Sequence, residues 1–109
     1  MKITIENKEY NLKANGKYMK KYHDLFKGNL IIDTYKAFEQ NDLYIVAQLM
    51  YCAIEDIEIN FEDWLDQFEN PYFILPYKVE LQDFLLSGIT PTVKYNGAED
   101  DSKKKKINQ

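Results

Sequence analysis

The chain has 109 residues, of which 45% are hydrophobic and 15% aromatic, and its formal net charge is −4. This length and composition suit one folded domain with a single core and exclude a disordered chain. The uninterrupted apolar runs, such as Leu43 to Ala47 and Leu49 to Ile54, are far shorter than the roughly 20 residues of a membrane-spanning helix, so no membrane partner is expected.

The basic residues indicate which partners to expect, and the single cysteine indicates the compartment. All 14 basic residues are lysines, and lysine cannot reproduce the bidentate contacts that arginine makes with phosphates and bases, so no nucleic-acid partner is expected. Cys52, the single cysteine, cannot form a disulfide within the chain, which fits a reducing cytoplasm.

Charge is distributed unevenly along the chain. Residues 1–36 hold eight lysines and four acids, whereas residues 37–77 hold nine acids and no lysine. This separation either draws the two halves of the fold together or leaves an acidic surface for a partner. The sequence leaves both interpretations open.

The first predicted element is a β-hairpin over residues 2–13, because apolar and polar residues alternate on both sides of Asn7-Lys8. Such a hairpin is marginal alone, so its apolar face should rest on helices. A helix over 17–27 follows, and Gly28 is predicted to be its left-handed C-terminal cap. Its expected inward stripe is Tyr18, Met19, Tyr22, Leu25 and Phe26.

Two more helices are predicted in the middle of the chain. The first covers residues 33–40, with Asp33 as its N-cap and with Tyr35 and Phe38 on one side. The second covers residues 42–56. From Leu43 to Ile54 its only polar residue is Gln48, which predicts a buried central helix.

The clearest amphipathic pattern predicts a helix over 61–69, capped by Asn60. Its apolar residues fall at helical spacing: Phe61, Trp64, Leu65 and Phe68. A last helix is predicted over 76–87, because proline suits a first helical turn and Gly88 offers a stop. Its expected inward residues are Leu81, Phe84 and Leu85.

The predicted fold is therefore of the α+β class and mostly α. A hairpin packs on a small bundle of about four to five helices over residues 1–90, and residues 91–109, where periodicity ends, are expected to form a disordered tail. No catalytic residue, cofactor or metal site is expected. His23 is read as a surface residue, Cys52 as a small buried hydrophobe with a raised pKa, and Trp64 as part of the core.

Two clusters remain as candidate binding surfaces. One is the apolar segment Tyr72, Phe73, Ile74 and Tyr77, which either packs across the core or forms an exposed patch that grips apolar helices. The other is an acidic surface that would mimic nucleic-acid phosphates and inhibit a DNA-binding enzyme. It comprises Glu55, Asp56, Glu58, Glu62, Asp63 and Asp66.

The opening "MKITIENKEYNLK", the apolar "LYIVAQLMYCAI" and the later "INFEDWLDQF" resemble, in order and pattern, the tail assembly chaperones of long-tailed bacteriophages of low-GC hosts. The resemblance covers roughly residues 1–88. It implies a non-enzymatic role in the host cytoplasm, with binding of the tape measure protein and recruitment of tail tube protein before the tube polymerises. It also implies absence from the mature virion and leaves the oligomeric state open.

The same family commonly makes a longer product by −1 ribosomal frameshifting near the end of the short frame. The lysine codons AAA and AAG make the RNA for Lys103, Lys104, Lys105 and Lys106 rich in adenine. The resemblance therefore implies a slippery site at these codons, followed by an extension. The alternative is that the lysines serve only as charge on a solubilising tail.

Overall fold

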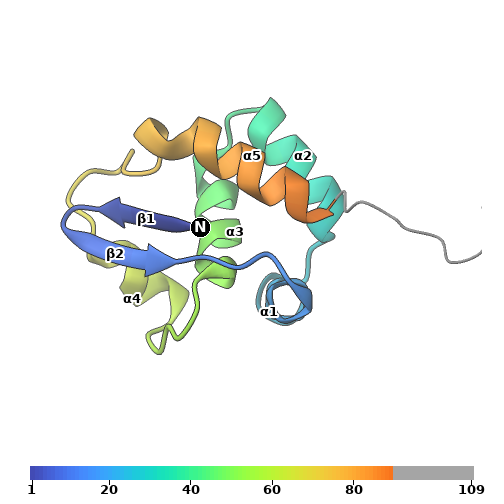
Figure 1. Ribbon diagram of the computed structural model, residues 1–109, viewed down its shortest axis with the longest axis horizontal. Coiled ribbons are helices and arrows are strands. Elements are labelled where there is room, and N and C mark those ends of the chain that lie inside the picture. The colour runs from blue at the N-terminus through green and yellow to red at the C-terminus, as the bar shows by residue number, and fades with distance from the viewer. Residues whose placement is uncertain (90–109) are drawn as a thin grey trace, which may run out of the picture.

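The computed structural model describes residues 1–89 of the chain. Within that part, an antiparallel hairpin lies across a bundle of five α-helices (Figure 1), which confirms the predicted fold class. No helix there is both long and apolar enough to cross a membrane. The strands are β1 (Lys2–Ile5) and β2 (Lys8–Asn11), and the helices are α1 (Gly16–Phe26), α2 (Leu30–Glu39), α3 (Leu43–Ala53), α4 (Phe61–Asp66) and α5 (Lys78–Ile89).

The hairpin turn lies at Glu6-Asn7, one residue earlier than predicted. Both residues have positive φ, 50° and 69°, which is the geometry of the two-residue turn that suits twisted strands. Lys8 is already the first residue of β2, paired with Ile5. The side chains of Ile3 and Ile5 lie on the buried face of the hairpin.

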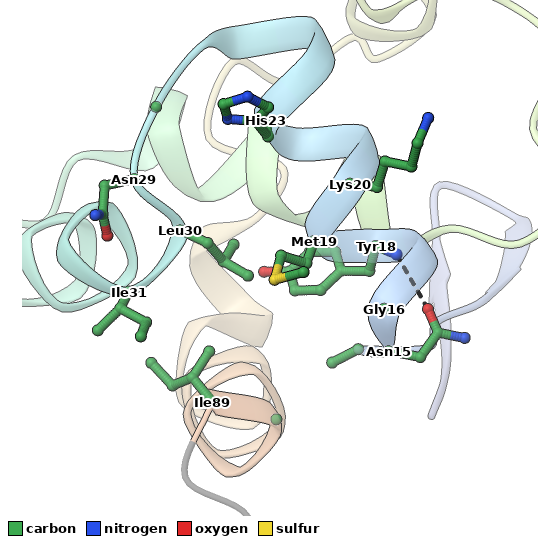
Figure 2. Close-up of a pocket in the computed structure, with 13 residues that line it drawn as sticks. Asn15, Gly16, Tyr18, Met19, Lys20, His23, Asn29, Leu30, Ile31 and Ile89 are labelled. Carbon is green, nitrogen blue, oxygen red and sulfur yellow. Dashed lines mark hydrogen bonds between the residues drawn. The ribbon is translucent and has the colours of Figure 1, made fainter.

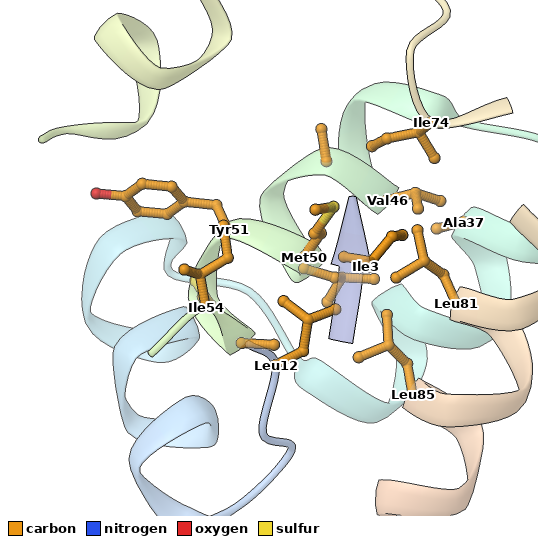
Figure 3. Close-up of a cluster of buried hydrophobic side chains, with 14 of the residues drawn as sticks. Ile3, Leu12, Ala37, Val46, Met50, Tyr51, Ile54, Ile74, Leu81 and Leu85 are labelled. Atoms are coloured by element: carbon orange, nitrogen blue, oxygen red, sulfur yellow. The ribbon is translucent and has the colours of Figure 1, made fainter. Parts of the chain in front are cut away.

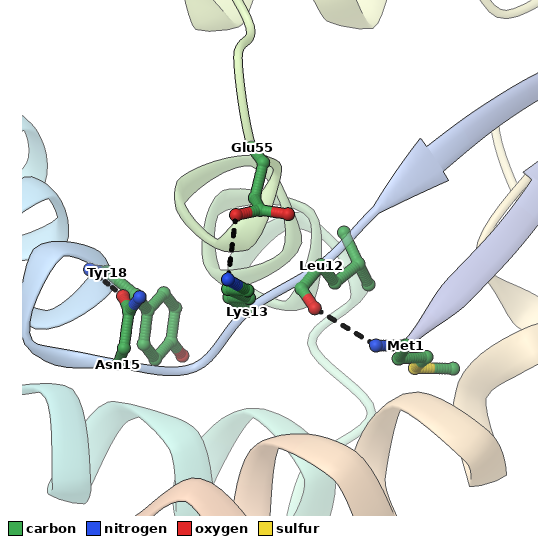
Figure 4. A network of polar contacts seen from close by, with 6 residues as sticks. All are labelled: Met1, Leu12, Lys13, Asn15, Tyr18 and Glu55. Carbon is green, nitrogen blue, oxygen red and sulfur yellow. Dashed lines mark hydrogen bonds and ion pairs between the residues drawn. The ribbon is translucent and has the colours of Figure 1, made fainter.

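The hairpin is joined to the end of α3 by backbone hydrogen bonds. Leu12 forms an antiparallel bridge with Ile54, and the Glu55 amide donates to the Asn11 carbonyl over 2.8 Å. Figure 4 shows the same junction, where Lys13 Nζ lies 3.4 Å from a Glu55 carboxylate oxygen. Because Ile54 takes an extended conformation in this bridge, α3 ends at Ala53 rather than at residue 56.

Helix α3 forms the centre of the core, as its apolar sequence predicted. Val46, Leu49 and Met50 are completely buried. Figure 3 shows Val46 and Met50 among side chains from the hairpin and from α5. Leu81 and Leu85 of α5 are also fully buried, whereas Phe84 is only partly covered.

Helix α2 starts earlier than predicted and has a different cap. It begins at Leu30, and the Asn29 side chain accepts a hydrogen bond of 3.0 Å from the Ile32 amide. Asp33, the predicted cap, instead accepts a 2.7 Å hydrogen bond from the Tyr22 hydroxyl. Asparagine and aspartate are about equally favourable as N-caps. Asn29 lies three residues before the Ile32 amide and therefore takes the role predicted for Asp33. Asp33 is thereby left available to join α2 to α1.

Both glycines that were predicted to end helices have other roles. Lys27, not Gly28, takes the left-handed conformation after α1, with φ 56°. A Cβ on Gly28 would overlap the Asp33 carboxylate. Gly88 lies inside α5, where an added Cβ would stand 2.6 Å from the Ala14 Cβ. Each glycine therefore permits a close approach between segments.

Helix α4 is shorter than the predicted 61–69, although its cap and the burial of Phe61 and Trp64 are confirmed, while Leu65 and Phe68 are partly buried. Asn60 accepts from the Asp63 amide at 2.8 Å, and Trp64 is 1% exposed. Beyond Asp66 the next amides bond three residues back, which tightens the turn. The chain then reaches a short 3-10 turn, Leu75–Tyr77, which holds Pro76 and leads into α5.

Candidate protein-binding groove

A groove of about 950 Å³ lies between α1, the start of α2 and the end of α5. Figure 2 shows Met19 of α1, Leu30 and Ile31 at the start of α2, and Ile89 at the end of α5 around this groove. Met19 is 56% exposed and Ile31 is 54% exposed. An apolar groove open to solvent is a typical site for a partner's apolar side chains.

The local sequence explains why Met19 faces the groove and not the core. Tyr18 and Tyr22, four residues apart, turn toward the core and are 3% and 1% exposed. Met19 follows Tyr18 by one helical step of about 100°, so it lies at the side of this stripe. Leu25, also predicted to face inward, is 52% exposed. The predicted stripe was therefore wider than the surface that α3 covers.

The second wall depends on the turn between α1 and α2. Lys27 to Asn29 reverse the chain, and the Tyr22–Asp33 hydrogen bond fixes the two helices beside each other. Leu30 and Ile31 then begin α2 next to α1 and line the groove. The third wall is the end of α5, brought close by the contact of Gly88 with Ala14.

The charged and polar groups of the groove are cationic or neutral. The lining side chains that carry such groups are Asn15, Tyr18, Lys20, His23 and Asn29, and none of the lining residues is a carboxylic acid. Lys20 forms an exposed pair with Asp24, 3.1 Å between Nζ and Oδ2. The first turns of α1 and α2 both open onto the groove, and Asp33, in the first turn of α2 beside Gly28, offsets the partial positive charge of that helix N-terminus.

Buried hydroxyl and thiol groups lie under this region. Burial raises the pKa of Tyr18, and burial together with the bond to Asp33 raises the pKa of Tyr22. Burial also raises the pKa of the Cys52 thiol to about 12, while the nearby Lys21 charge opposes that rise. This confirms the interpretation of Cys52 as a buried hydrophobe. His23 is exposed, as predicted.

The predicted apolar segment divides between core and surface. Phe73 and Ile74 are 7% and 2% exposed, and the Phe73 ring stacks on Phe68 with 3.8 Å between ring centroids. Tyr77 is partly buried and donates its hydroxyl to the Thr4 carbonyl at 2.7 Å. Tyr72 alone is largely exposed, at 61%. The four residues therefore do not form one exposed patch, and the alternative, packing across the core, describes most of them.

Tyr72 does border a second, smaller hollow. This hollow, of about 350 Å³, lies where α3 and α4 meet the segment after α4, and Tyr44 also lines it. Tyr44 is 55% exposed. The two tyrosines offer a second apolar contact area, smaller than the groove at α1 and α2.

All six predicted acidic residues are exposed. Glu55, Asp56 and Glu58 lie on the loop after α3, and the other three, Glu62, Asp63 and Asp66, lie on α4. Lys13 pairs with Glu55 and offsets part of this charge. No group of three or more potential metal ligands is found among residues 1–89. The predicted slippery codons, for residues 103–106, lie outside the described residues.

The sequence pattern did not indicate Ile31 and Ile89 as binding residues, and it predicted that Met19 would face the core. One usable signal was the width of the apolar face on α1. Another was "LII" at the start of α2, where two isoleucines precede the predicted helix.

Comparison of the chain with protein-family models, with curated proteins and with solved structures returned no match.

Proposed function

We propose that this protein is a phage tail assembly chaperone that acts by stoichiometric binding. In this proposal it holds the tape measure protein in the host cytoplasm and recruits tail tube protein before the tube polymerises, and it leaves before the virion matures. Binding lowers the concentration of free partner that can aggregate, so mass action suffices and no catalytic residue is needed.

The observation that carries the proposal is the open apolar groove with Met19 and Ile31 both more than half exposed. Aggregation-prone helical proteins expose apolar side chains, and an apolar groove between helices can cover a row of them. The proposed contact residues are therefore Met19, Ile31 and Ile89, with Tyr72 and Tyr44 as a second contact area.

The decisive experiment is co-expression of the full chain with the tape measure and tail tube proteins of a long-tailed phage whose genome encodes this chain. The soluble fraction of tape measure protein should rise strongly when the chaperone is present. The double variant Met19→Asp/Ile31→Asp should abolish this rise, because two charges enter the apolar groove.

A matched control makes the result specific. Leu25 and Ile32 are 52% and 51% exposed, lie on the same two helices and do not line the groove. The double variant Leu25→Asp/Ile32→Asp should therefore keep the activity. Tape measure protein that stays insoluble with the unaltered chain, or equal loss in both double variants of equal stability, would refute the proposal.

The longer product is a separate part of the proposal and has a separate test. We propose that ribosomes slip on the codons of Lys103 to Lys106, so that residues before this point are shared by two products. Synonymous AAG codons that interrupt the adenine run should remove the longer product from mass spectra while the short product persists. Persistence of the longer product would assign it to another mechanism.

Exposure of the six acidic residues supports the second candidate function, inhibition of a DNA-binding enzyme by phosphate mimicry. Such binding should weaken steeply with salt, whereas apolar burial in the groove should resist salt. Charge reversal of Glu62 and Asp66 to lysine separates the two functions. It should abolish inhibition by a mimic and leave groove binding intact.

A further inference from the structure

The described part of the chain ends at the groove between α1, α2 and α5. Gly88 and Ile89, the last two residues of α5, line this groove together with Met19 and Ile31 (Figure 2). The close approach of Gly88 to Ala14, two residues before α1, holds the end of α5 beside the start of α1. The rest of the chain, residues 90–109, therefore starts from a wall of the groove.

The sequence that follows α5 changes from helical spacing to a strict alternation. From Ile89 onward the apolar positions are Pro91, Val93 and Tyr95, and the positions between them are Thr90, Thr92 and Lys94. A period of two residues is typical of an extended segment with one buried face. Pro91 favours the same conformation, because proline disfavours helical backbone at the residue before it. The turn signal Asn96-Gly97 ends the alternation.

The length of this alternating segment suits the groove. Six extended residues, 90–95, span about 20 Å at roughly 3.3 Å each. Helix α1 has 11 residues and is therefore about 16 Å long at about 1.5 Å per residue. A segment that starts at Ile89 is thus long enough to run along the whole of α1. Because the groove is open to solvent, the amides of such a segment can keep their contact with water.

Attachment to the groove favours this segment over a separate molecule. A segment joined to the wall of its own site binds at an effective concentration on the order of 1 mM, so contacts too weak to hold a free peptide suffice. A separate molecule also loses translational and rotational freedom when it binds. Met19 and Ile31 are more than half exposed, and covering their apolar area is favourable.

We propose that residues 90–95 form a strap that lies extended in the groove of the same chain. Val93 and Tyr95 contact Met19 and Ile31, whereas Thr92 and Lys94 face solvent. The strap covers the groove when no partner is bound, and a partner displaces it. This inference goes beyond the proposed chaperone function and does not depend on it.

Single cysteines along the strap of the full-length chain test this. Thr92→Cys, Val93→Cys, Lys94→Cys and Tyr95→Cys are each treated with a maleimide, and mass spectrometry separates the strap thiol from the buried Cys52. Each rate is divided by the rate of the same variant unfolded in urea. Cysteine is itself a small hydrophobe, so one substitution leaves most of the contact in place.

The rates should alternate along the strap. Positions 93 and 95 should react at least about fivefold more slowly than positions 92 and 94, because protection follows the fraction of time for which a thiol is covered. The charge of Lys94 cannot produce this order. A neighbouring ammonium group lowers the pKa of a thiol and would make positions 93 and 95 react faster.

Substitutions in the groove locate the contact. Met19→Asp and Ile31→Asp, on two different helices, should each abolish the alternation, because a charge enters the apolar contact. Leu25→Asp is the matched control. Leu25 is 52% exposed on the same helix as Met19 but does not line the groove, so this variant should retain the alternation.

Three results would overturn the inference. One is a set of similar rates or the reverse order of rates, and another is an alternation that both groove variants leave intact. The third is protection that grows over about a hundredfold range of protein concentration, because the segment would then lie in the groove of a second copy.

The test is separate from that of the chaperone function, because tape measure protein takes no part in it. If the rates do not alternate, the strap is wrong and the chaperone proposal stands as before. If the rates alternate but tape measure protein stays insoluble in the co-expression experiment, the chaperone function is the part that fails.

Discussion

The Tyr22 hydroxyl on α1 donates a 2.7 Å hydrogen bond to the Asp33 carboxylate on α2, directly beside Gly28. Tyr22 is 1% exposed. The bond therefore lies at the margin of the core, where water competes with it only weakly. It fixes the angle at which α2 leaves α1. The same bond joins the two helices that carry Met19 and Ile31 on the walls of the groove.

Removing either partner of this bond should destabilise the protein. Tyr22→Phe and Asp33→Ala should each cost about 1–2 kcal/mol, and the double variant should cost less than their sum by about 1 kcal/mol, because one shared bond is lost. Urea denaturation followed by Trp64 fluorescence measures these free energies of unfolding. Strict additivity would mean that the two side chains do not interact.

Lys27→Gly should stabilise the fold. Lys27 has φ 56°, and left-handed backbone costs a residue with a side chain about 1 kcal/mol, which glycine avoids. Loss of the exposed Lys27 Nζ contact with the Asp24 carbonyl and the extra freedom of the unfolded chain offset part of this gain, so a net gain of about 0.5 kcal/mol is expected.

The control for that change is Lys20→Gly in the interior of α1, which should destabilise by about 1 kcal/mol. Thermal unfolding should give midpoints in the order Lys27→Gly, unaltered chain, Lys20→Gly. A lower midpoint for Lys27→Gly than for the unaltered chain would contradict the assignment of backbone strain to this residue.

Cys52 should make the protein less stable in alkali. Burial raises the pKa of its thiol from 9.0 to about 12, so the folded chain keeps a proton that the unfolded chain loses. The associated stability is complete below pH 9 and falls as pH rises toward 12. Between about pH 8 and about pH 10, the unaltered chain should lose on the order of 1 kcal/mol more than Cys52→Ala does.

The comparison isolates the thiol because both chains contain Tyr18 and Tyr22, whose raised pKa values act in the same direction. Free energies of unfolding in urea at several pH values provide the test. Parallel pH profiles for the two chains would show that the folded state does not hold the Cys52 proton. A thiol reagent should also modify Cys52 only as fast as the chain unfolds.

Glu6 should act as a clamp between the hairpin turn and the segment after α4. Its two carboxylate oxygens accept hydrogen bonds of 3.1 Å and 3.2 Å from the Glu69 and Asn70 amides. Glu6→Ala should cost about 1 kcal/mol of stability. Glu9→Ala, an exposed acid of the same hairpin, is the control and should cost less than about 0.5 kcal/mol.

Hydrogen exchange adds a local measurement to this prediction. The Glu69 and Asn70 amides should exchange faster in Glu6→Ala than in Glu9→Ala, since only the first change removes their acceptor. Equal exchange in the two variants would mean that the clamp does not persist in solution.

Several elements followed from the sequence because short-range rules govern them. The burial of Phe61 and Trp64 on one face of α4 and the Asn60 cap depend on residues within two turns of each other, so spacing alone predicted them. The burial of α3 followed from the absence of a polar face. The hairpin followed from alternation, although the positive φ values that place its turn at Glu6-Asn7 left no signal in the pattern.

Other features depended on contacts between distant segments. Gly28 and Gly88 looked like helix stops, but each instead admits a neighbour, Asp33 in one case and Ala14 in the other. Phe73 and Ile74 looked like a patch until Phe68 and the core covered them. In each case the local pattern allowed two outcomes, and the energy of packing chose between them.

The sequence by itself determined that the chain forms a mostly helical fold with an N-terminal hairpin, and which helix is central. Only the tertiary structure decided that Met19 and Ile31 remain exposed across one groove while equally apolar neighbours are buried. The physical reason is that the hydrophobic effect depends on which area another element covers. The spacing of apolar residues in a sequence predicts the apolar face of a helix, but the packing of α1, α2 and α5 decides which of those side chains face water.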